Sequence, residues 1–320
     1  MRPDAITIRQ LRALVAIEQM GSLTGAAEKV GLTVPAIHSQ IKTLESLLEC
    51  QLVRRKADNA GSELTTEGLA VLDAANRIEG TLTQCANDVR AISRGYAGRV
   101  KVGVVSTGKY FAPWLVKMLR QECPEIEIAL SVGNRETIIQ GLDQETLDLA
   151  IMGRPPRHPA VDAQLLGPHP HGLLVAPDHP AADGNHPKIN ELLQNVFLSR
   201  ERGSGTRILM ARYLDRIGEG QIIDYLEMDS NESIKQAAMA GLGVAFLSLH
   251  TATEEIASGR LVRVNLPDLP IVRHWFLVQL SGRPNRAVVE RLTNSILALK
   301  GSYLPIPTGS RADRPDQSTG

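Results

Sequence analysis

The chain has 320 residues, of which 43% are hydrophobic and 22% charged, so it has room for two or three compact units with their own cores. Its 35 Lys and Arg residues balance 35 Asp and Glu residues, which excludes a chain that binds partners as an overall polycation. No run of 18 apolar residues and no charged-then-apolar leader is seen, so we expect a cytoplasmic protein without a membrane partner. Cys50, Cys85 and Cys123 are too scattered for a disulfide or metal framework, and we expect three buried thiols.

Residues 21 to 45 predict two short helices joined by a tight turn. Ser22 and Thr33 are typical helix N-caps, Gly31 is suited to end the first helix, and Pro35 fits the first turn of the second. Leu32 is expected to fill the space beneath the turn. This pattern is typical of a helix-turn-helix whose second helix enters the major groove of DNA.

The exposed face of the second helix supplies the predicted contacts to DNA. Ile37, Ile41 and Leu44 form its buried stripe, which leaves small and hydrogen-bonding side chains on the opposite face. An amphipathic helix before this pair, a basic cluster after it and a wing at residues 56–63 complete a predicted three-helix winged module. Residues 1–65 contain eight Lys and Arg against seven Asp and Glu, so affinity must come from placement of charge and from two or more copies per site. The predicted DNA-binding residues are Ser22, Thr33, Val34, Pro35, His38, Ser39, Lys42, Arg54, Arg55 and Lys56.

Three runs resemble the N-terminal domain of LysR-type transcription regulators. They are Ser-x-x-x-Ala-Ala-Glu from Ser22, Leu-Thr-x-Pro-Ala-Ile from Leu32 and Gln-Ile-x-x-Leu-Glu from Gln40. Val34, His38 and Cys50 depart from the residues common in that family, which are Gln, Ser and Gly. The resemblance implies a winged helix-turn-helix domain at residues 1–65 that binds double-stranded promoter or operator DNA.

Residues 66–94 predict one long helix. Its apolar residues follow a strict 4-3 alternation at Val71, Ala75, Ile78, Leu82, Cys85, Val89 and Ile92. Such a seam is typical of a coiled coil, whereas a helix lying on a globular core has a broader apolar stripe. Because the seam lies between a DNA-binding module and a separate domain, we favour a linker and dimerisation helix over packing within one chain.

From residue 99 onward, predicted strands and helices alternate. Strands are expected at 100–105, 126–132, 147–152, 172–176, 222–228, 244–247 and 275–280, and helices at 110–122, 136–144, 205–217, 231–240 and 287–299. Two successive parallel α/β units connected twice predict a two-lobed α/β domain, like periplasmic binding proteins, with the ligand between the lobes at the carboxyl ends of strands. We assign this effector-binding domain to residues 95–302, and a disordered tail rich in Pro, Gly and Ser to residues 303–320.

Four polar clusters follow predicted strands in this domain, at residues 106–110, 133–136, 153–157 and 203–207. Hydroxyl groups, helix starts and nearby cations are typical of anion sites. Each cluster alone is weak evidence, but four clusters at carboxyl ends of strands predict one shared cleft for a small anion. The predicted effector-binding residues are Ser106, Thr107, Lys109, Tyr110, Asn134, Arg135, Glu136, Arg154, Ser204, Gly205, Thr206, Arg207, Asn231, Glu232 and Lys235.

Longer runs in this domain resemble one LysR subgroup, the activators of Calvin-cycle (RuBisCO) operons. They lie at residues 106–113, 133–137, 152–157, 203–207 and 230–241, and the resemblance spans about residues 5 to 300. It implies a homotetramer built as a dimer of dimers that activates carbon-fixation genes, with RNA polymerase as a candidate partner. It also implies response to a small anionic effector, either a phosphorylated metabolite or NADPH, and no covalent cofactor.

Other functions fit the sequence less well. Ser106 and Ser204 lack a GxSxG setting, and residues 203–207 lack the Lys-Ser/Thr ending of a P-loop, so we predict that the chain is not an enzyme. His158, His169 and His171 have no Cys or acidic companions, so we expect surface histidines and no metal. The open alternatives are a LysR-type regulator of another operon and a solute-binding protein without a DNA role.

Overall fold

The computed structural model describes residues 1–56, 61–282 and 286–306. Half of the predicted wing (residues 57–60) and the predicted tail from residue 307 onward lie outside the described residues. The chain divides into two compact units, which are described separately. The first unit comprises Met1–Asn87 with Gln144–Thr146, and the second comprises Asp88–Asp143 with Leu147–Gly320.

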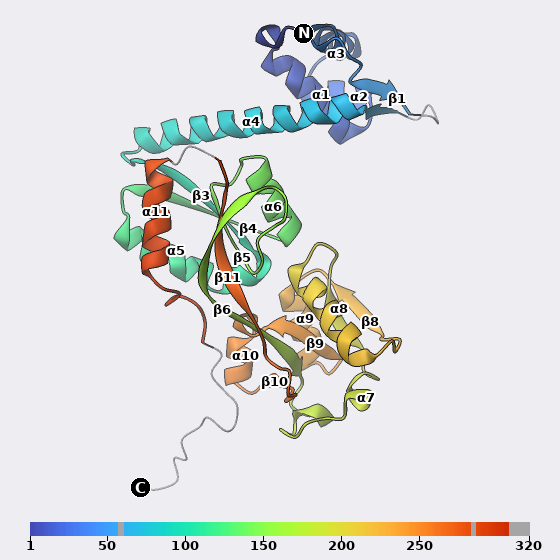
Figure 1. Cartoon of the computed structure of the whole chain (residues 1–320), viewed down its shortest axis with the longest axis vertical. Helices are drawn as coiled ribbons and strands as arrows, with labels where there is room; N and C mark the ends of the chain where they lie inside the picture. The colour runs from blue at the N-terminus through green and yellow to red at the C-terminus, as the bar shows by residue number, and fades with distance from the viewer. Residues whose placement is uncertain (57–60, 283–285, 307–320) are drawn as a thin grey trace. The chain divides into compact units, whose positions relative to one another are not determined.

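The first unit is a three-helix module with a two-stranded antiparallel ribbon (Figure 1). Its elements are η1 (Pro3–Ala5), α1 (Ile8–Met20), α2 (Leu23–Val30), α3 (Val34–Leu48), β1 (Val53–Arg55), β2 (Ser62–Leu64) and the start of α4 (Thr66–Ser93). The hydroxyls of Ser22 and Thr33 accept hydrogen bonds from the backbone N–H groups of Gly25 and Ala36, as expected of N-caps. Gly31 ends α2 in the left-handed conformation, which a residue without Cβ adopts freely.

The core of the first unit contains the apolar stripes of all three helices. Leu14, Ile17 and Leu44 are fully buried, and Ala26 lets α2 approach its neighbours closely. The prediction for Leu32 is wrong, because its side chain is 45% exposed. A backbone hydrogen bond of 2.9 Å from its N–H to the carbonyl of Ala27 closes the turn, so no side chain is needed beneath it.

The predicted seam of α4 divides into two parts. Val71 and Ala75 pack on the core of the first unit, which corrects their assignment to an intermolecular seam. Ile78 and Leu82 are 41% and 39% exposed, and Val89 and Ile92 are more exposed than either of them. The expectation of three buried thiols is also corrected, because Cys85 is exposed and Cys50 is half-buried, while Cys123 is buried.

The second unit is built on a nine-stranded mixed sheet with the order β4-β3-β5-β11-β6-β9-β7-β8, in which β10 also pairs with β6. Its strands are β3 (Gly98–Val105), β4 (Ile126–Gly133), β5 (Leu149–Met152), β6 (Val161–Val175), β7 (Phe197–Arg200), β8 (Tyr225–Met228), β9 (Val244–Ser248), β10 (Val262–Arg263) and β11 (Ile271–Leu280). Its helices are η2 (Ser106–Tyr110), α5 (Ala112–Glu122), α6 (Arg135–Asp143), η3 (Pro180–Ala182), α7 (Ile189–Leu192), α8 (Gly205–Gly218), α9 (Asn231–Met239), η4 (Leu249–Thr251), α10 (Thr253–Ala257) and α11 (Ala287–Ala298).

The strand pairing differs from two separate parallel units. β3 is parallel to β4 and β5 in one lobe, and β7 is parallel to β8 and β9 in the other. The long strands β6 and β11 pair antiparallel to one another and run through both lobes, joining them into one sheet (Figure 1). The sequence predicted only the last part of β6 and missed β7, because a backbone ladder set by distant residues stabilises these segments rather than local alternation.

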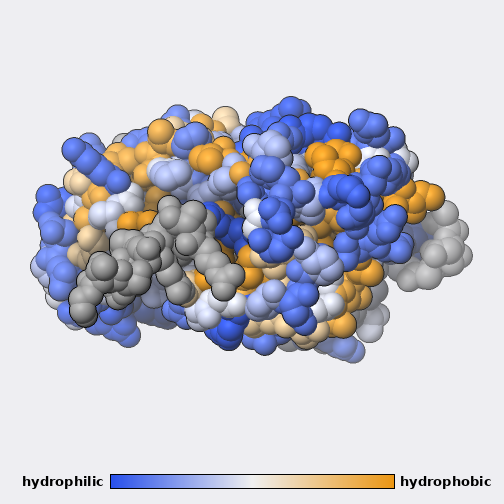
Figure 2. All heavy atoms as spheres, turned by 90° about the horizontal axis from the view of Figure 1, so that it is seen from below, coloured by the Kyte–Doolittle hydropathy of each residue, from blue (hydrophilic) through white to orange (hydrophobic). Residues whose placement is uncertain are grey.

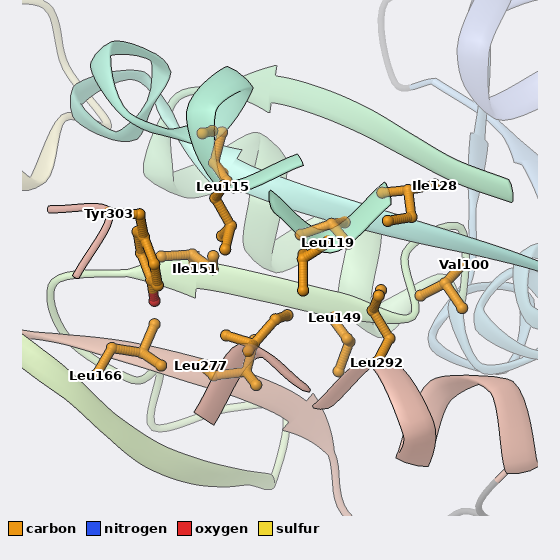
Figure 3. Packing of buried hydrophobic residues seen from close by; sticks show 14 of the residues in the cluster. Val100, Leu115, Leu119, Ile128, Leu149, Ile151, Leu166, Leu277, Leu292 and Tyr303 are labelled. Atoms are coloured by element: carbon orange, nitrogen blue, oxygen red, sulfur yellow. The ribbon is translucent and has the colours of Figure 1, made fainter. Parts of the chain in front are cut away.

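The core of the first lobe extends to the end of the described chain. Leu115, Ile151, Leu277 and Leu292 come from α5, β5, β11 and α11 and point toward one another (Figure 3). Tyr303 is buried in the same cluster near Ile151, so the predicted disordered tail cannot begin at residue 303.

On the face seen in Figure 2, hydrophobic residues form separate patches between larger hydrophilic areas. In the described part of the chain, no helix is both long and apolar enough to span a bilayer.

Candidate functional site

The first candidate surface is the outer face of α3. Val34, Pro35, His38, Ser39 and Lys42 are all exposed there, opposite the stripe buried in the core. A helix that shows small and donor-bearing side chains on one face is suited to contact base edges in a major groove. Ser22 is half-buried and, with Thr33, uses its hydroxyl to cap a helix.

Several cations of this unit already hold carboxylate partners. The ammonium of Lys42 lies 2.8 Å from Glu45, Arg54 lies 2.8 Å from Glu63, and Arg12 makes two hydrogen bonds to Glu79. Arg55 and Lys56 are exposed at the end of β1. A phosphate that binds Lys42 or Arg54 must therefore compete with a carboxylate of the same chain.

Glu45 is a structural residue of α3 that the sequence reasoning did not single out. Its Oε1 accepts hydrogen bonds from the N–H groups of Leu52 and Val53, at 2.9 and 3.2 Å, and its Oε2 accepts one from Lys42. Burial acts to raise the pKa of Glu45, but these hydrogen bonds outweigh burial and leave the pKa below its usual value. The carboxylate thereby fixes the end of α3 to the start of the ribbon.

The second candidate site is a cavity of about 340 Å³ in the second unit, between its two lobes. The first lobe contributes the end of β3, the start of η2, the start of α6 and the loop after β5, and the second contributes the first half of α8 with the residue before it. The long strands β6 and β11, which run through both lobes, contribute two histidines and one arginine. The lining residues are Val105, Ser106, Thr107, Arg135, Gly153, Arg154, Pro155, Arg157, His169, His171, Ser204, Gly205, Thr206, Ile208, Leu209, Arg212 and Arg273. Seven of the predicted effector-binding residues lie here, namely Ser106, Thr107, Arg135, Arg154, Ser204, Gly205 and Thr206.

The charge of the lining is entirely positive. Five arginines line the cavity, and no Asp or Glu does. The guanidinium of Arg135 is held by the backbone carbonyls of Arg154 and Pro155, and burial together with the charge of Arg154 lowers its pKa. None of the five arginines forms an ion pair with a carboxylate among the described residues. Arg157, Arg212 and Arg273 were missed as site residues by the sequence reasoning.

Lys109, Tyr110 and Glu232 were predicted to bind the effector but do not line the cavity. Instead, the ammonium of Lys109 and the hydroxyl of Tyr110 both donate hydrogen bonds to the carboxylate of Glu232. Burial, and then the hydrogen bond to Glu232, raise the pKa of Tyr110. Because η2 and α9 belong to different lobes, this cluster joins the lobes beside the cavity.

The other predicted residues outside the lining also have partners within the chain. Lys235 forms a buried ion pair with Glu255 at 2.8 Å, and Arg207 pairs with Glu227. Asn134 accepts a hydrogen bond from Thr137 and so caps α6. Of the remaining two residues, Asn231 accepts a hydrogen bond from Arg200, and Glu136 lies close to Gly203.

Arg200, which the sequence reasoning missed, is a buried arginine on β7. It donates to the side chains of Asn231 and Glu201, and its Nη2 lies 3.2 Å from the hydroxyl of Ser106 in the other lobe. Because Ser106 lines the cavity and Arg200 does not, Arg200 positions a cavity residue from outside the lining.

The expectation of surface histidines is wrong for His169 and His171, which are 3% and 4% exposed, whereas His158 is exposed. His169 stacks on Trp275 with ring centres 3.7 Å apart, and its Nε2 lies 2.9 Å from the hydroxyl of Ser248. Burial lowers the pKa of His169 well below its usual value and lowers that of His171 to about 3. In the described residues no group of three His, Cys, Asp or Glu could hold a metal ion.

Comparison with protein families assigns both units. Residues 8–69 match the family described as "Bacterial regulatory helix-turn-helix protein, lysR family", and residues 93–299 match the "LysR substrate binding domain". The "HTH-type transcriptional regulator CbbR" of Cereibacter sphaeroides is 55% identical over 305 residues, which cover 95% of this chain and 98% of the relative.

Solved structures agree with this assignment. The regulatory domain of Synechocystis PCC6803 CcmR in complex with 2-PG is 32% identical, with a TM-score of 0.59 over 63% of this chain and 97% of that domain. Full-length CbnR complexed with its target DNA has a TM-score of 0.64 over 91% of this chain and 99% of that chain; at 19% identity it shows the fold alone. The predicted helix-turn-helix, long helix and α/β effector domain are thus confirmed.

These matches rule out one of the two alternatives left open by the sequence, the solute-binding protein. A solute-binding protein without a DNA role would lack the helix-turn-helix that matches here, and the matched families are those of transcription regulators rather than enzymes. The chain belongs to the LysR family of transcriptional regulators and is similar to CbbR.

Proposed function

We propose that the chain activates a carbon-fixation (RuBisCO) operon in response to a small phosphorylated metabolite that binds in the cavity between the lobes. The observation that carries this proposal is the cavity with five arginines and no carboxylate in its lining. Guanidinium groups bind phosphate and carboxylate oxygens by strong, paired hydrogen bonds. A ligand that brings two or more negative charges would offset the mutual repulsion of these arginines.

The size of the cavity selects between the two predicted kinds of effector. At about 340 Å³ it lies near the lower end of the range for ligand pockets, about 300–1,000 Å³. A phosphorylated compound of a few carbon atoms suits this space better than a dinucleotide such as NADPH. The 2-PG in the CcmR complex is of the smaller kind.

The cavity residues suggest how binding is transmitted. Arg135 and Arg154 belong to one lobe, and Ser204 and Thr206 begin α8 in the other, so one ligand would hold both lobes. A ligand that binds a closed form more tightly than an open form shifts the chain toward the closed form. In the proposed mechanism α4 carries this change to the spacing of the DNA-binding helices.

The proposed assembly rests on the exposed part of α4. Ile78, Leu82, Val89 and Ile92 form an apolar stripe that a second α4 would cover, and two such dimers would form the tetramer. In this assembly several copies of α3 bind one promoter, with His38, Ser39 and Lys42 toward DNA. RNA polymerase recruited to that promoter would complete the activation, which takes place in the cytoplasm where the chromosome lies.

A pair of arginine variants tests the effector site. Replacing Arg135 by alanine removes one charged donor from the cavity and should weaken binding of 2-phosphoglycolate about 10- to 100-fold, since a hydrogen bond to a charged group contributes about 1.5–3 kcal/mol. Calorimetric titration measures the affinity, and DNA footprints with and without ligand measure the response. The matched control is Arg207→Ala, which removes an arginine outside the cavity. Equal ligand responses in the two variants would place the effector elsewhere.

A further inference from the structure

His171 can offer the cavity a nitrogen that only accepts hydrogen bonds, whereas the five arginines only donate them and the hydroxyls of the lining can do either. Its ring lies on β6, lines the cavity and is 4% exposed. Its Nδ1 lies 3.0 Å from the backbone carbonyl oxygen of His169. Because a carbonyl oxygen only accepts hydrogen bonds, the proton of the neutral ring must be on Nδ1, and Nε2 carries a free lone pair.

Nε2 of His171 has no hydrogen-bond partner among the described residues. The groups that face this ring are His169, with ring centres 4.2 Å apart, together with His250 and Arg273, and none of them supplies a negative charge. The ring therefore stays neutral near pH 7, because its pKa is lowered to about 3 by burial. Nε2 is not one of the fully buried side-chain atoms that lack a partner, so a hydrogen-bond donor on a ligand in the cavity can reach its lone pair.

The arginines of the lining and the acceptor of His171 bind different groups of a ligand. The five arginines only donate hydrogen bonds, so they bind the anionic oxygens of a ligand. The lone pair of His171 repels such oxygens and attracts an O–H group. The two kinds of residue thus favour opposite ends of one small molecule and fix its orientation.

We propose that His171 selects effectors that carry a hydroxyl group besides their anionic groups, by accepting a hydrogen bond from that hydroxyl at Nε2. This inference rests on the proposed function, because it assumes that the anion binds in the same cavity. It distinguishes phosphorylated hydroxy acids and sugar phosphates from phosphorylated acids without a hydroxyl.

Two probes that differ only in this group test the selection on the full-length protein. The first is 3-phosphoglycerate, and the second is 3-(phosphonooxy)propanoate, which keeps the phosphate and the carboxylate but lacks the hydroxyl. We expect the first probe to bind about five- to tenfold more tightly in calorimetric titrations, which is the usual net contribution of one hydrogen bond. Equal affinities would overturn the selection and leave the arginine site intact, and so would binding of 2-phosphoglycolate without binding of either probe. Binding of none of the three compounds would overturn the proposed function together with this inference.

Variants then assign the preference to His171. His171→Phe keeps an aromatic ring but removes the acceptor, so the ratio of the two affinities should fall to about one. His171→Gln places an amide oxygen near Nε2 and should restore part of the preference. Arg154→Ala is the matched cavity control, and it should weaken both probes by the same factor. A preference that survives in His171→Phe, whose folding is checked by circular dichroism, would contradict the assignment.

Discussion

The surface proposed to bind DNA and the cavity proposed to bind the effector differ in how their positive charges are paired. On the first unit, Lys42, Arg54 and Arg12 lie beside Glu45, Glu63 and Glu79. In the cavity, the five arginines form no ion pair with a carboxylate among the described residues. A phosphate of DNA gains little when it replaces a carboxylate, whereas an anion in the cavity meets charge that is not yet compensated. Affinity for DNA should therefore depend on the number of copies, and affinity for the effector on the local charge.

The largest expected effect follows from this dependence on copies. Leu82→Asp introduces a charge into the exposed stripe of α4, and a dimer would bury two such charges without partners, which should weaken self-association by more than about 3 kcal/mol, or over 100-fold. DNA binding should disappear while the effector unit stays folded. Analytical ultracentrifugation and circular dichroism measure the two outcomes. Thr83→Asp, at an exposed position off the stripe, is the control, and a Leu82→Asp protein that remains dimeric would show that α4 does not form the interface.

A smaller effect is expected where a paired carboxylate has a structural role. Glu45→Gln loses the ion pair with Lys42 and weakens the bonds to the amides of Leu52 and Val53, so the first unit should lose about 1–3 kcal/mol of its free energy of unfolding. The pKa of Glu45 is lowered in the folded chain. Its contribution is therefore fully present above the unfolded-state pKa and is lost as the pH falls through the folded-state pKa.

Urea unfolding as a function of pH measures this contribution, and hydrogen exchange at the α3 amides localises it. The advantage of the parent over Glu45→Gln should start to fall near pH 4.3, the pKa of the unfolded carboxyl, and should disappear below the folded-state pKa. Glu63→Gln, which breaks the exposed pair with Arg54, should cost less than about 1 kcal/mol. If both variants have the same stability profile, the buried carboxylate does not fix α3 to the ribbon.

The first unit could be predicted largely from the sequence because its signals are local. The hydroxyls of Ser22 and Thr33 each accept a hydrogen bond from the backbone N–H three residues later, and Gly31 ends α2 where a left-handed conformation is required. Each of these features depends on neighbours within one turn of helix. Leu32 and the first part of the α4 seam were misjudged because their environment depends on packing between elements.

The cavity was only partly predictable because its residues come from distant segments. Arg273 lies on β11 in register with His169 on β6, and no local pattern gives that register. Arg212 did leave a signal, since Gly205, Ile208, Leu209 and Arg212 follow the i, i+3, i+4, i+7 spacing of one helix face. Ion pairing within the chain also decides which cations are available to a ligand. Lys109 and Arg207 look equivalent to Arg135 in the sequence, but Glu232 and Glu227 neutralise them.

A sequence-specific contact should have a moderate effect confined to one base pair. His38 is exposed on the face of α3 that we propose contacts DNA, so His38→Ala should cost about 1–3 kcal/mol on the preferred operator and almost nothing on an operator altered at that base pair. Competition gel shifts with single-substituted operators measure the difference. Ser46→Ala, near the carboxyl end of α3, is the control. Unchanged affinity and preference in His38→Ala would exclude this residue from base recognition.

The smallest effect is expected at Lys42, and it tests the comparison of paired and unpaired charge most directly. To bind a phosphate, the ammonium of Lys42 must break its ion pair with Glu45, so the contact with DNA has a small net free energy. Lys42→Ala therefore removes little binding free energy. The affinity at moderate salt should therefore fall only slightly and to the same degree on all sequences. The dependence of log K on log salt should nevertheless become shallower by about 0.9 for each phosphate that the variant no longer neutralises, because fewer counterions are released. Lys29→Ala, an exposed lysine on α2, provides the control. A slope equal to that of the parent would mean that Lys42 keeps its bond to Glu45 in the complex, and that DNA binding uses only cations without carboxylate partners.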